Sequence, residues 1–461
     1  MLSASELAAC IPGAALQGDG RTRFTSVCSD SRQIRPGCLF VALRGDRFDG
    51  HDFVAAAASS GAAAALVERP VDAALAQVIV RDSRRALGIG AAAWRSRFRL
   101  PLIAVAGSNG KTTVTQMIAA ILRAWLGDGA FATEGNLNNH IGVPLTLFRL
   151  DESFRYAVVE MGANHPGEIA ALARIAAPTV GLVTNAGAEH LEGFGDLDGV
   201  ARAEGEMFAA LGAGATAVVN ADDAFAPLWR DMSTAGRCLT FGIVKPADFR
   251  ARNLSCGIER GEWLTRFDLD TPAGSVPVRL ALTGVHNVLN AAGAAAAAWA
   301  CGADAGHIAA GLAGVRPVKG RMQLKPAAQG AWLIDDSYNA NPTSALAGLE
   351  VLGGLAGERW LVLGEMAELG EHAAAGHVEV GRAAGRQGVS RLFAMGPTTL
   401  HAVEAFGPGG GWYPDVEALT AALKAELHAG VTVLVKGSRV NRLERVVEAL
   451  VEAPPAACNG N

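Results

Sequence analysis

The chain has 461 residues, half of them hydrophobic, and a formal net charge of −5. This length exceeds what one hydrophobic core organises and predicts about three domains. The acidic balance and the lack of a basic block exclude a general nucleic-acid-binding protein, so no nucleic-acid partner is expected. Seven cysteines without a C-x-x-C pair exclude a disulfide framework and a cysteine-rich zinc site, and they favour a reducing, cytoplasmic location.

The first hundred residues alternate short apolar segments with alanine-rich segments of helical character. This alternation predicts a small α/β domain. Strands are expected at 39–43, 64–67 and 77–80, and helices at 54–60 and 86–98.

A new apolar strand begins at Leu102 and runs into a glycine loop just before a helical pattern. The loop residues are Gly107, Ser108, Asn109, Gly110, Lys111, Thr112 and Thr113. Glycines let backbone N–H groups wrap a phosphate, Lys111 reaches the outer phosphates, and Thr112 can hold Mg²⁺. The loop is shorter than the G-x-x-x-x-G-K-[ST] template, because Val105 stands where that spacing requires glycine. The stretch predicts a nucleoside triphosphate site, and a glycine turn without ligand is the alternative.

Further strands, each followed by helical sequence, predict a mostly parallel sheet with helices on both faces. They are expected at 156–160, 179–184 and 216–219. The stretch from Asn220 to about 280 is polar and irregular, and only its alternating segments 262–269 and 276–282 predict an antiparallel extension.

Two helices, at 287–300 and 305–313, are expected to close this unit. The first lies in the longest weakly polar stretch, 281–303, which is built on alanine and contains His286 and Asn287. Alanine drives membrane insertion weakly, so we expect a buried or interface helix and no membrane insertion.

Residues 315–320 have the composition of a linker between domains. Beyond it, strands interleaved with helices predict a third α/β domain, with the strands at 331–335, 359–363, 391–394 and 431–435. The expected domains are 1–100, 101–316 and 317–461, and the tail from Ala453 to Asn461 is expected to be disordered.

Two strand ends carry residues suited to a metal. Glu160 ends a buried strand at the sheet edge where open α/β sheets place ligands. The strand that ends at Asn185 runs into a segment with His190 and two acids. Placement of Thr112, Glu160 and His190 at strand ends favours a metal site over a surface histidine, and Mg²⁺ prefers oxygen ligands with only one or two from protein.

Several strings of residues resemble the Mur ligases of peptidoglycan synthesis. They are Gly107–Thr113, Asn185–Leu191, Gly284–Asn290, Gly320-Arg321 and Asp335–Pro342, in the order found in that family. Together with Ser29–Arg32 and Lys436–Arg439, the resemblance covers positions 29–439. It implies an N-terminal UDP-binding domain, a central ATP-binding domain with a P-loop-like parallel sheet, and a C-terminal Rossmann-like domain.

The strings Asp335–Pro342, Leu363–Gly370 and Lys436–Arg439 are similar to those of the family members that join D-alanyl-D-alanine to UDP-N-acetylmuramoyl-tripeptide. The resemblance therefore implies these two partners and an ATP-dependent ligase that gives the pentapeptide, ADP and phosphate. Ser31 and Arg32 are expected to contact the UDP part. Lys436 and Arg439 are expected to meet a substrate carboxylate or phosphate, and a basic pair that caps a helix is the alternative.

The family phosphorylates a carboxylate with ATP, and an amine then displaces phosphate from the acyl phosphate. By resemblance, Lys111 neutralises the transferring phosphoryl group, Thr112 and Glu160 hold one Mg²⁺, and His190 helps to hold a second. The resemblance also implies that Asn290, Arg321 and Asp336 contact ATP, so that the active site is a cleft between domains. On local sequence alone, the alternatives are a linker charge for Arg321 and a helix N-cap for Asp336.

Glu204 departs from the family pattern, because relatives usually carry lysine at this place. In several Mur ligases that lysine is converted by CO₂ to a carbamate that helps to organise the second Mg²⁺. The hypothesis is that the Glu204 carboxylate replaces the carbamate, and a solvated helix residue is the alternative.

Two other classes of protein fit part of the pattern. Folylpolyglutamate synthases share the tight glycine–lysine loop but lack the domain that carries Ser29–Arg32. A nucleotide-gated binding protein needs fewer metal groups than the acids and histidine found here. We expect a monomer, since nothing in the sequence demands more, and closure of the domains on ATP binding.

Overall fold

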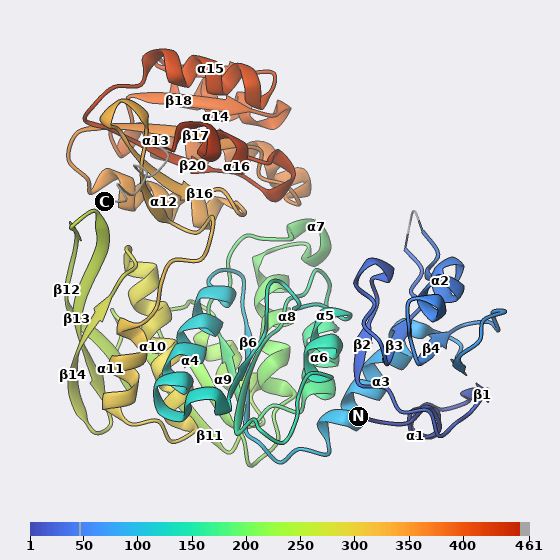
Figure 1. Cartoon of the computed structure of the whole chain (residues 1–461). Coiled ribbons are helices and arrows are strands. Elements are labelled where there is room, and N and C mark those ends of the chain that lie inside the picture. Colours follow the sequence, from blue (N-terminus) through green and yellow to red (C-terminus); the bar gives the residue numbers. More distant parts are fainter. Residues whose placement is uncertain (46–47, 452–461) are drawn as a thin grey trace, which may run out of the picture.

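Three β-sheets, each flanked by helices, organise the computed structural model, which describes residues 1–45 and 48–451 (Figure 1). This arrangement confirms the predicted α/β class with three sheet-based units. The domain boundaries at 100 and 316 stay predictions, and the predicted disordered tail at 453–461 lies outside the described residues.

The N-terminal unit contains a five-stranded sheet of order β1-β5-β4-β3-β2, in which only β1 runs antiparallel to its neighbour. Strands β3 and β4 are buried along their whole length, as expected for apolar strands covered on both faces. The elements are α1 (Ala4–Cys10), β1 (Ala15–Gln17), β2 (Ser26–Cys28), η1 (Ser31–Gln33), β3 (Cys38–Val41), η2 (Gly50–Phe53), α2 (Val54–Ser59), β4 (Ala64–Val67), β5 (Ala76–Ile79) and α3 (Ser83–Arg95).

Helix α3 anchors the N-terminal unit to the central unit. The buried guanidinium of Arg95 donates to three carbonyl oxygens, those of Ala176 at 2.9 Å, Phe98 at 2.7 Å and Leu100 at 3.1 Å. Burial lowers the pKa of Arg95, and the three carbonyls replace the water that its charge has lost. Trp94 of the same helix donates from Nε1 to the carbonyl oxygen of Leu150 at 3.0 Å.

The central unit holds a nine-stranded sheet of order β14-β13-β12-β11-β10-β9-β6-β8-β7. Strands β7 to β11 and β6 are parallel, and β12, β13 and β14 form an antiparallel extension. The elements are β6 (Leu102–Ala106), α4 (Lys111–Leu126), η3 (Gly127–Gly129), β7 (Ala130–Ala132), α5 (Gly142–Leu147), β8 (Tyr156–Glu160), α6 (Glu168–Ala176), β9 (Val180–Val183), α7 (Leu191–Phe194), α8 (Leu197–Ala209), β10 (Thr216–Asn220), α9 (Ala226–Met232), β11 (Arg237–Gly242), β12 (Phe249–Glu259), β13 (Glu262–Thr271), β14 (Gly274–Leu280), α10 (Val285–Ala300) and α11 (Ala305–Ala313).

The expectation of an irregular stretch before 262 is wrong for β11 and β12. Most of β12 is exposed, and its register shifts between Arg252 and Ser255, so its sequence lacks a regular alternation of apolar and polar residues. The expected buried helix is confirmed as α10, whose residues 291–298 are buried beneath α4 and β11. No helix among the described residues is long and apolar enough to cross a membrane.

The C-terminal unit holds a six-stranded sheet of order β15-β16-β20-β17-β18-β19, parallel except for β15. The elements are β15 (Gln323–Pro326), η4 (Ala328–Gly330), β16 (Trp332–Asp336), α12 (Pro342–Gly353), β17 (Glu358–Gly364), η5 (Gly370–His372), α13 (Ala373–Arg386), β18 (Arg391–Met395), η6 (Pro397–Thr399), α14 (Leu400–Phe406), β19 (Gly410–Tyr413), α15 (Val416–Glu426), β20 (Val431–Lys436), η7 (Arg439–Asn441) and α16 (Glu444–Leu450).

The β12–β13 hairpin of the central unit reaches the C-terminal unit (Figure 1). Trp263 on β13 is buried in the same apolar cluster as Ile334 and Leu349 of the C-terminal sheet and helix. Its Nε1 donates to the carbonyl oxygen of Met322 at 2.9 Å. The two units are therefore joined by a buried contact as well as by the linker.

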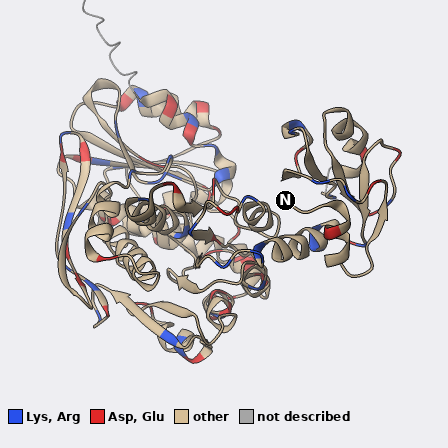
Figure 2. Ribbon diagram, turned by 60° about the horizontal axis from the view of Figure 1, so that its bottom comes forward, with Lys and Arg blue, Asp and Glu red and all other residues tan. Residues whose placement is uncertain are grey.

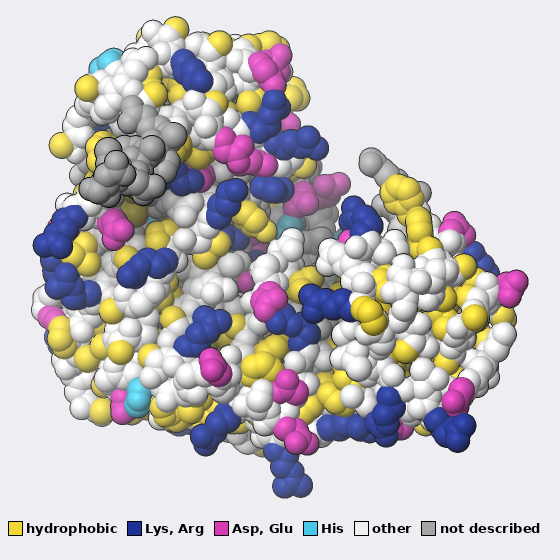
Figure 3. All heavy atoms as spheres, in the orientation of Figure 1, with side chains coloured by type: hydrophobic (Ala, Val, Ile, Leu, Met, Phe, Trp, Pro, Cys, Tyr) yellow, Lys and Arg dark blue, Asp and Glu magenta, His cyan; other side chains and the backbone are white. Residues whose placement is uncertain are grey.

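Charged residues of both signs are spread over the described parts of the chain that Figures 2 and 3 show. Figure 2 shows Lys and Arg interspersed with Asp and Glu along the ribbon of all three units. Figure 3 shows a deep notch between the C-terminal and N-terminal units, with charged side chains of both signs on its walls.

Candidate active site

The glycine loop lies at the centre of the nine-stranded sheet, between the end of β6 and the start of α4. Gly107 and Gly110 adopt φ of 118° and 87°. A Cβ at Gly107 would lie 2.1 Å from Oγ1 of Thr184, and one at Gly110 would lie 2.6 Å from Oδ1 of Asn290. Both positions therefore require glycine for conformation and for space. The N-terminus of α4 points its free N–H groups at the loop, which suits a phosphate.

Lys111 folds back over this loop and is nearly buried. Its Nζ donates to the carbonyl oxygens of Gly107 at 2.5 Å and Ser108 at 2.9 Å, and it pairs with Oε1 of Glu189 at 3.1 Å. Burial opposes the ammonium charge, but the carboxylates of Glu189, Glu204 and Glu160 outweigh it and raise the pKa of Lys111. Three acidic side chains surround the single ammonium group of Lys111, so negative charge is in excess at the loop. Binding of a polyphosphate without a cation would increase this excess.

Glu204 projects from α8 into the same buried space and is 2% exposed. Its Oε2 accepts a hydrogen bond of 2.7 Å from the backbone N–H of Gly107. Burial raises the pKa of Glu204 to about 7, and Glu189 adds to this effect while Lys111 opposes it. The alternative of a solvated helix residue is therefore wrong, because this carboxylate is buried against the phosphate loop.

The other residues expected at a metal are already oriented by neighbours. Oε1 of Glu160, at the end of β8, accepts from Nδ2 of Asn138 at 2.7 Å. The hydroxyl of Thr112 accepts from Arg321 across the domain boundary at 3.3 Å. His190 has φ of 49° and pairs through Nδ1 with Oε2 of Glu368 at 2.5 Å.

The oxygen and nitrogen donors of Thr112, Glu160 and His190 suit Mg²⁺, which takes few ligands from protein. They suit less well a metal ion whose ligands all come from protein. Within residues 1–45 and 48–451, no group of three or more His, Cys, Asp and Glu side chains is placed to hold a metal ion. Magnesium keeps water and phosphate oxygens in its shell and needs only one or two protein oxygens. Thr112 and Glu160 carry oxygen donors of the kind that such an ion could use.

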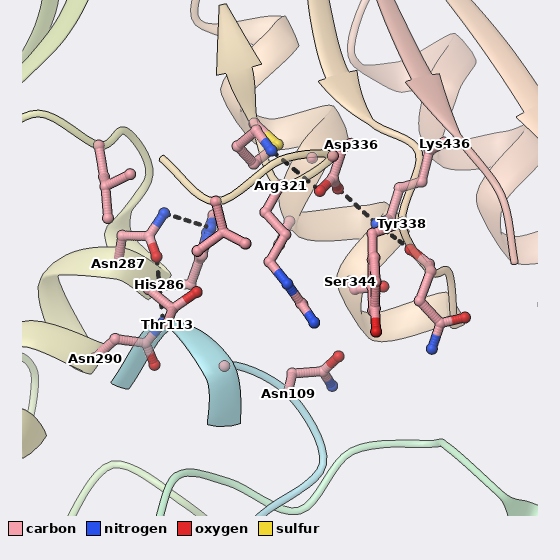
Figure 4. A pocket seen from close by; sticks show the side chains of 18 of the residues that line it. Asn109, Thr113, His286, Asn287, Asn290, Arg321, Asp336, Tyr338, Ser344 and Lys436 are labelled. Carbon is pink, nitrogen blue, oxygen red and sulfur yellow. Dashed lines mark hydrogen bonds and ion pairs between the residues drawn. The ribbon is translucent and has the colours of Figure 1, made fainter. Parts of the chain in front are cut away.

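A cavity between the central and C-terminal units adjoins the loop (Figure 4). Side chains from both units line it, among them Asn109, Thr113, His286, Asn287, Asn290, Arg321, Asp336, Tyr338, Ser344 and Lys436. Asn290 donates to Asn287 at 3.2 Å, and Asn287 donates to the carbonyl oxygen of Thr283 at 2.7 Å. Burial lowers the pKa of His286, which favours a neutral ring at this wall.

The two units contact each other directly at this cavity. Asn341, the N-cap of α12, donates from Nδ2 to Oδ1 of Asn109 in the glycine loop at 3.0 Å. Figure 4 shows the guanidinium of Arg321 extending into the cavity between Asn109 and Asp336. Among the described residues, Nε of Arg321 and Nδ2 of Asn109 are buried donors without a hydrogen-bond partner. Buried donors of this kind indicate a missing acceptor, and a nucleotide phosphate would supply one.

Asp336 and Lys436 form a buried pair on neighbouring strands of the C-terminal sheet. Nζ of Lys436 lies 2.5 Å from Oδ2 of Asp336 and donates to the carbonyl oxygen of Asn339 at 3.1 Å. The alternative that Asp336 caps a helix is wrong, since Asn341 caps α12. Lys436 therefore lines the cavity that adjoins the glycine loop, whereas the sequence led us to expect it to act together with Arg439.

Arg439 lies at a second cavity between the same two units. This cavity is lined by Asn136, Glu189, His190, Tyr338, Asn339, Ala340, Asn341, Ala367, Glu368, Ser438, Arg439 and Val440. Ser31 and Arg32 line neither cavity: Arg32 is exposed in the N-terminal unit and pairs with Asp30 at 2.8 Å. The structure thus brings together the loop, Glu160, Glu204, His190, Arg321 and Asp336, and leaves the proposed UDP contacts apart.

Sequence analysis missed several residues of this cleft. Glu189 and Glu368 lie in strings that were noted for their neighbours, so their position beside Lys111 and His190 had a partial signal. Tyr338 and Asn341 lie in the string Asp335–Pro342, so they had a partial signal of the same kind. Asn138 is uncharged and lies in none of these strings, and nothing in a single sequence separates it from a turn residue.

Comparisons with known proteins agree with this geometry. Three family models match: "Mur ligase family, catalytic domain" over residues 23–113, "Mur ligase middle domain" over 105–298, and "Mur ligase, glutamate ligase domain" over 320–439. A UDP-N-acetylmuramoyl-tripeptide–D-alanyl-D-alanine ligase of Escherichia coli strain K12 is 45% identical over 441 residues, which are 95% of this chain and 96% of that protein.

Solved structures show the same relation. MurF from Acinetobacter baumannii is 34% identical with a TM-score of 0.90, covering 97% of this chain and 98% of that one. MurF ligase from Thermotoga maritima in complex with ADP is 28% identical with a TM-score of 0.80, covering 93% and 97%. The sequence identity extends over nearly the whole chain, as does the shared fold, so this protein belongs to the Mur ligase family.

Proposed function

We propose that this protein is the ATP-dependent ligase that joins D-alanyl-D-alanine to UDP-N-acetylmuramoyl-tripeptide in peptidoglycan synthesis. The observation that carries the proposal is the interdomain cleft, in which a phosphate loop on one unit faces Arg321 and Asp336 on the other. The relatives named above, which match almost the full chain, act on these substrates or bind ADP.

The reaction has two steps. The carboxylate of the tripeptide takes the terminal phosphoryl group of ATP, which gives an acyl phosphate and ADP. The amine of D-alanyl-D-alanine then attacks the acyl carbon, and inorganic phosphate leaves. Both steps depend on positioning and on compensation of charge, because phosphorylation of the carboxylate brings two anions together.

Residues of the glycine loop and of α4 would hold the phosphates. Backbone N–H groups of residues 110–112 would donate to them, and Lys111 would leave the carbonyl oxygens of Gly107 and Ser108 to meet the transferring group. Bound Mg²⁺ supplies positive charge at the phosphate oxygens, and Thr112 and Glu160 are the residues placed to hold it. Arg321 and Asn109 would donate to the nucleotide through the buried N–H groups that lack a partner among the described residues.

Glu204 would serve where relatives use a carbamylated lysine. Its carboxyl group already lies against Gly107 and within electrostatic reach of Lys111, so its charged form would supply a buried anion at this place without modification. We propose that it helps His190 to organise a second Mg²⁺. Glu204→Ala should abolish turnover, and Glu204→Lys should regain part of it when bicarbonate is added. Near-normal turnover of the alanine variant would contradict this role.

The second cavity is the proposed site of the acceptor. Its lining includes Arg439 and Ser438, which would bind a carboxylate, and Glu189 and Glu368, which would lie near the incoming amine. The N-terminal unit, with Ser31 and Arg32, is the proposed site of the UDP group.

A phosphate-release assay with purified protein tests the function. Complete mixtures contain ATP, Mg²⁺, UDP-N-acetylmuramoyl-tripeptide and D-alanyl-D-alanine, and each is omitted in turn. Phosphate release that requires both the muramoyl peptide and the dipeptide is the expected result. Release with a folate and glutamate instead would favour a folylpolyglutamate synthase. ATP binding without release in any mixture would favour a nucleotide-gated binding protein.

A further inference from the structure

Tyr338 stands between the two cavities of the cleft and lines both of them. It follows β16 in the C-terminal unit, two residues after Asp336. Its ring is the nearest aromatic partner of two guanidinium groups: Cζ of Arg321 lies 4.5 Å from the ring centroid, and Cζ of Arg439 lies 5.9 Å from it. The two arginines face different cavities, Arg321 the nucleotide side and Arg439 the acceptor side.

The backbone fixes the position of this ring. The N–H of Tyr338 donates to the carbonyl oxygen of Gly320 at 3.1 Å. Gly320 has φ of 72°, and a Cβ there would lie 3.2 Å from Cβ of Tyr338. The base of the ring is therefore held against the residue that precedes Arg321.

Arg321 needs such support more than an ordinary surface arginine. Its guanidinium reaches across to Oγ1 of Thr112 at 3.3 Å, while its Nε is buried without a partner among the described residues. A long side chain with so few hydrogen bonds loses its orientation unless a packing surface restricts it. An aromatic face within 6 Å attracts a guanidinium electrostatically, and more strongly when water is excluded.

We propose that Tyr338 is a positioning residue that orients Arg321 toward the nucleotide and Arg439 toward the acceptor from one shared ring. The ring acts through its face, because no described residue hydrogen-bonds its hydroxyl. The part of this inference that concerns Arg439 rests on the proposed function, which identifies the acceptor. The part that concerns Arg321 does not.

The test compares Tyr338→Leu with Tyr338→Phe, which keeps the face of the ring. Tyr413→Leu is the matched control, since Tyr413 stacks on Phe393 at 5.8 Å in the same unit and lines neither cavity. The binding of a nonhydrolysable ATP analogue with Mg²⁺ is measured by calorimetry without muramoyl peptide or dipeptide. We expect Tyr338→Leu to weaken binding about tenfold, equal to about 1.4 kcal/mol. Tyr338→Phe should stay within about twofold of the wild type.

A double-mutant cycle separates positioning from a general structural effect. In an Arg321→Ala background, Tyr338→Leu should lower the affinity for the ATP analogue by less than about threefold. The guanidinium that the ring would orient is already absent there. On the acceptor side, Tyr338→Leu should raise the KM for D-alanyl-D-alanine, and Tyr338→Phe should not. Thermal unfolding confirms that each variant is folded.

Three results would overturn the proposal. They are an equal cost of Tyr338→Leu with and without Arg321, a loss in Tyr338→Phe as large as in Tyr338→Leu, and a loss confined to one of the two ligands. A wild-type protein that binds the analogue but forms no amide product would refute the proposed function instead. The analogue titrations would still test the link between Tyr338 and Arg321.

Discussion

Glu204→Gln should change the pH dependence of stability in the protein without nucleotide or metal. The carboxyl of Glu204 has a folded pKa of about 7 against an ordinary value of 4.5. A raised pKa means that the folded state binds the proton more tightly than the unfolded state. The resulting stabilisation is complete below pH 4.5 and is lost as the pH rises to 7, where the buried group becomes charged.

The size of this effect follows from the shift. A difference of about 2.5 pKa units corresponds to about 3 kcal/mol of unfolding free energy. Glutamine has nearly the same shape, and its amide oxygen can accept the N–H of Gly107, but it carries no charge at any pH. Relative to wild type, the variant should therefore gain at most about 3 kcal/mol between pH 5 and pH 8.

Urea unfolding at several pH values between 5 and 8 measures the difference. Asp198→Asn is the matched control, because Asp198 lies on the same helix and is exposed. The wild type and the control should lose stability toward pH 8 relative to Glu204→Gln. The opposite result is a difference between the unfolding midpoints of Glu204→Gln and wild type that stays constant over the whole pH range. This result would refute the assignment of a buried carboxyl that titrates in this range.

Three further predictions concern the loop and the anchor of the N-terminal unit. Gly110→Ala should abolish measurable binding of a nonhydrolysable ATP analogue by calorimetry, because its Cβ would lie 2.6 Å from Oδ1 of Asn290 at a φ of 87°. Lys111→Met should lower kcat in the phosphate-release assay by about 10²-fold or more, the usual cost of removing one group that stabilises transition-state charge. Arg95→Met should lower the unfolding free energy in urea by about 3 kcal/mol or more, since three buried carbonyls lose their donor. A loss below about 0.5 kcal/mol would show that water replaces the guanidinium.

The sequence predicts the structure best where the residues that define a feature lie within one short segment. The strand before Gly107 is apolar on both faces, and the loop and helix that follow have a fixed spacing, so this part of the central unit could be predicted. The strand that holds Arg252 could not, because most of its side chains are exposed and its register shifts. Its strand structure comes from pairing with β13, which no local pattern reveals.

The residues of the site also fall into those that a single segment predicts and those that only the folded structure brings together. Lys111 and Glu160 are recognisable from the segment that contains each. The contacts that complete the cleft join residues far apart in the chain, such as Asn109 with Asn341 and His190 with Glu368. These pairs exist only because the C-terminal unit lies against the central one. The burial of Glu204, which decides between a functional and a solvated residue, is likewise a property of the packed helix α8.

The contact of Trp263 with Met322 has a mechanical consequence. It lies close to the linker, and the hairpin that carries it meets the C-terminal unit at one side of the cleft, while α7 lies at the opposite side (Figure 1). Because Trp263 is buried against the C-terminal unit at this side, we expect that unit to turn about this side when the cleft opens. A small turn there becomes a large displacement at the far side, where His190 and Glu368 meet. The edge of the cleft farthest from Trp263 therefore moves most. The pair of His190 and Glu368 would be the first contact to separate when the cleft opens.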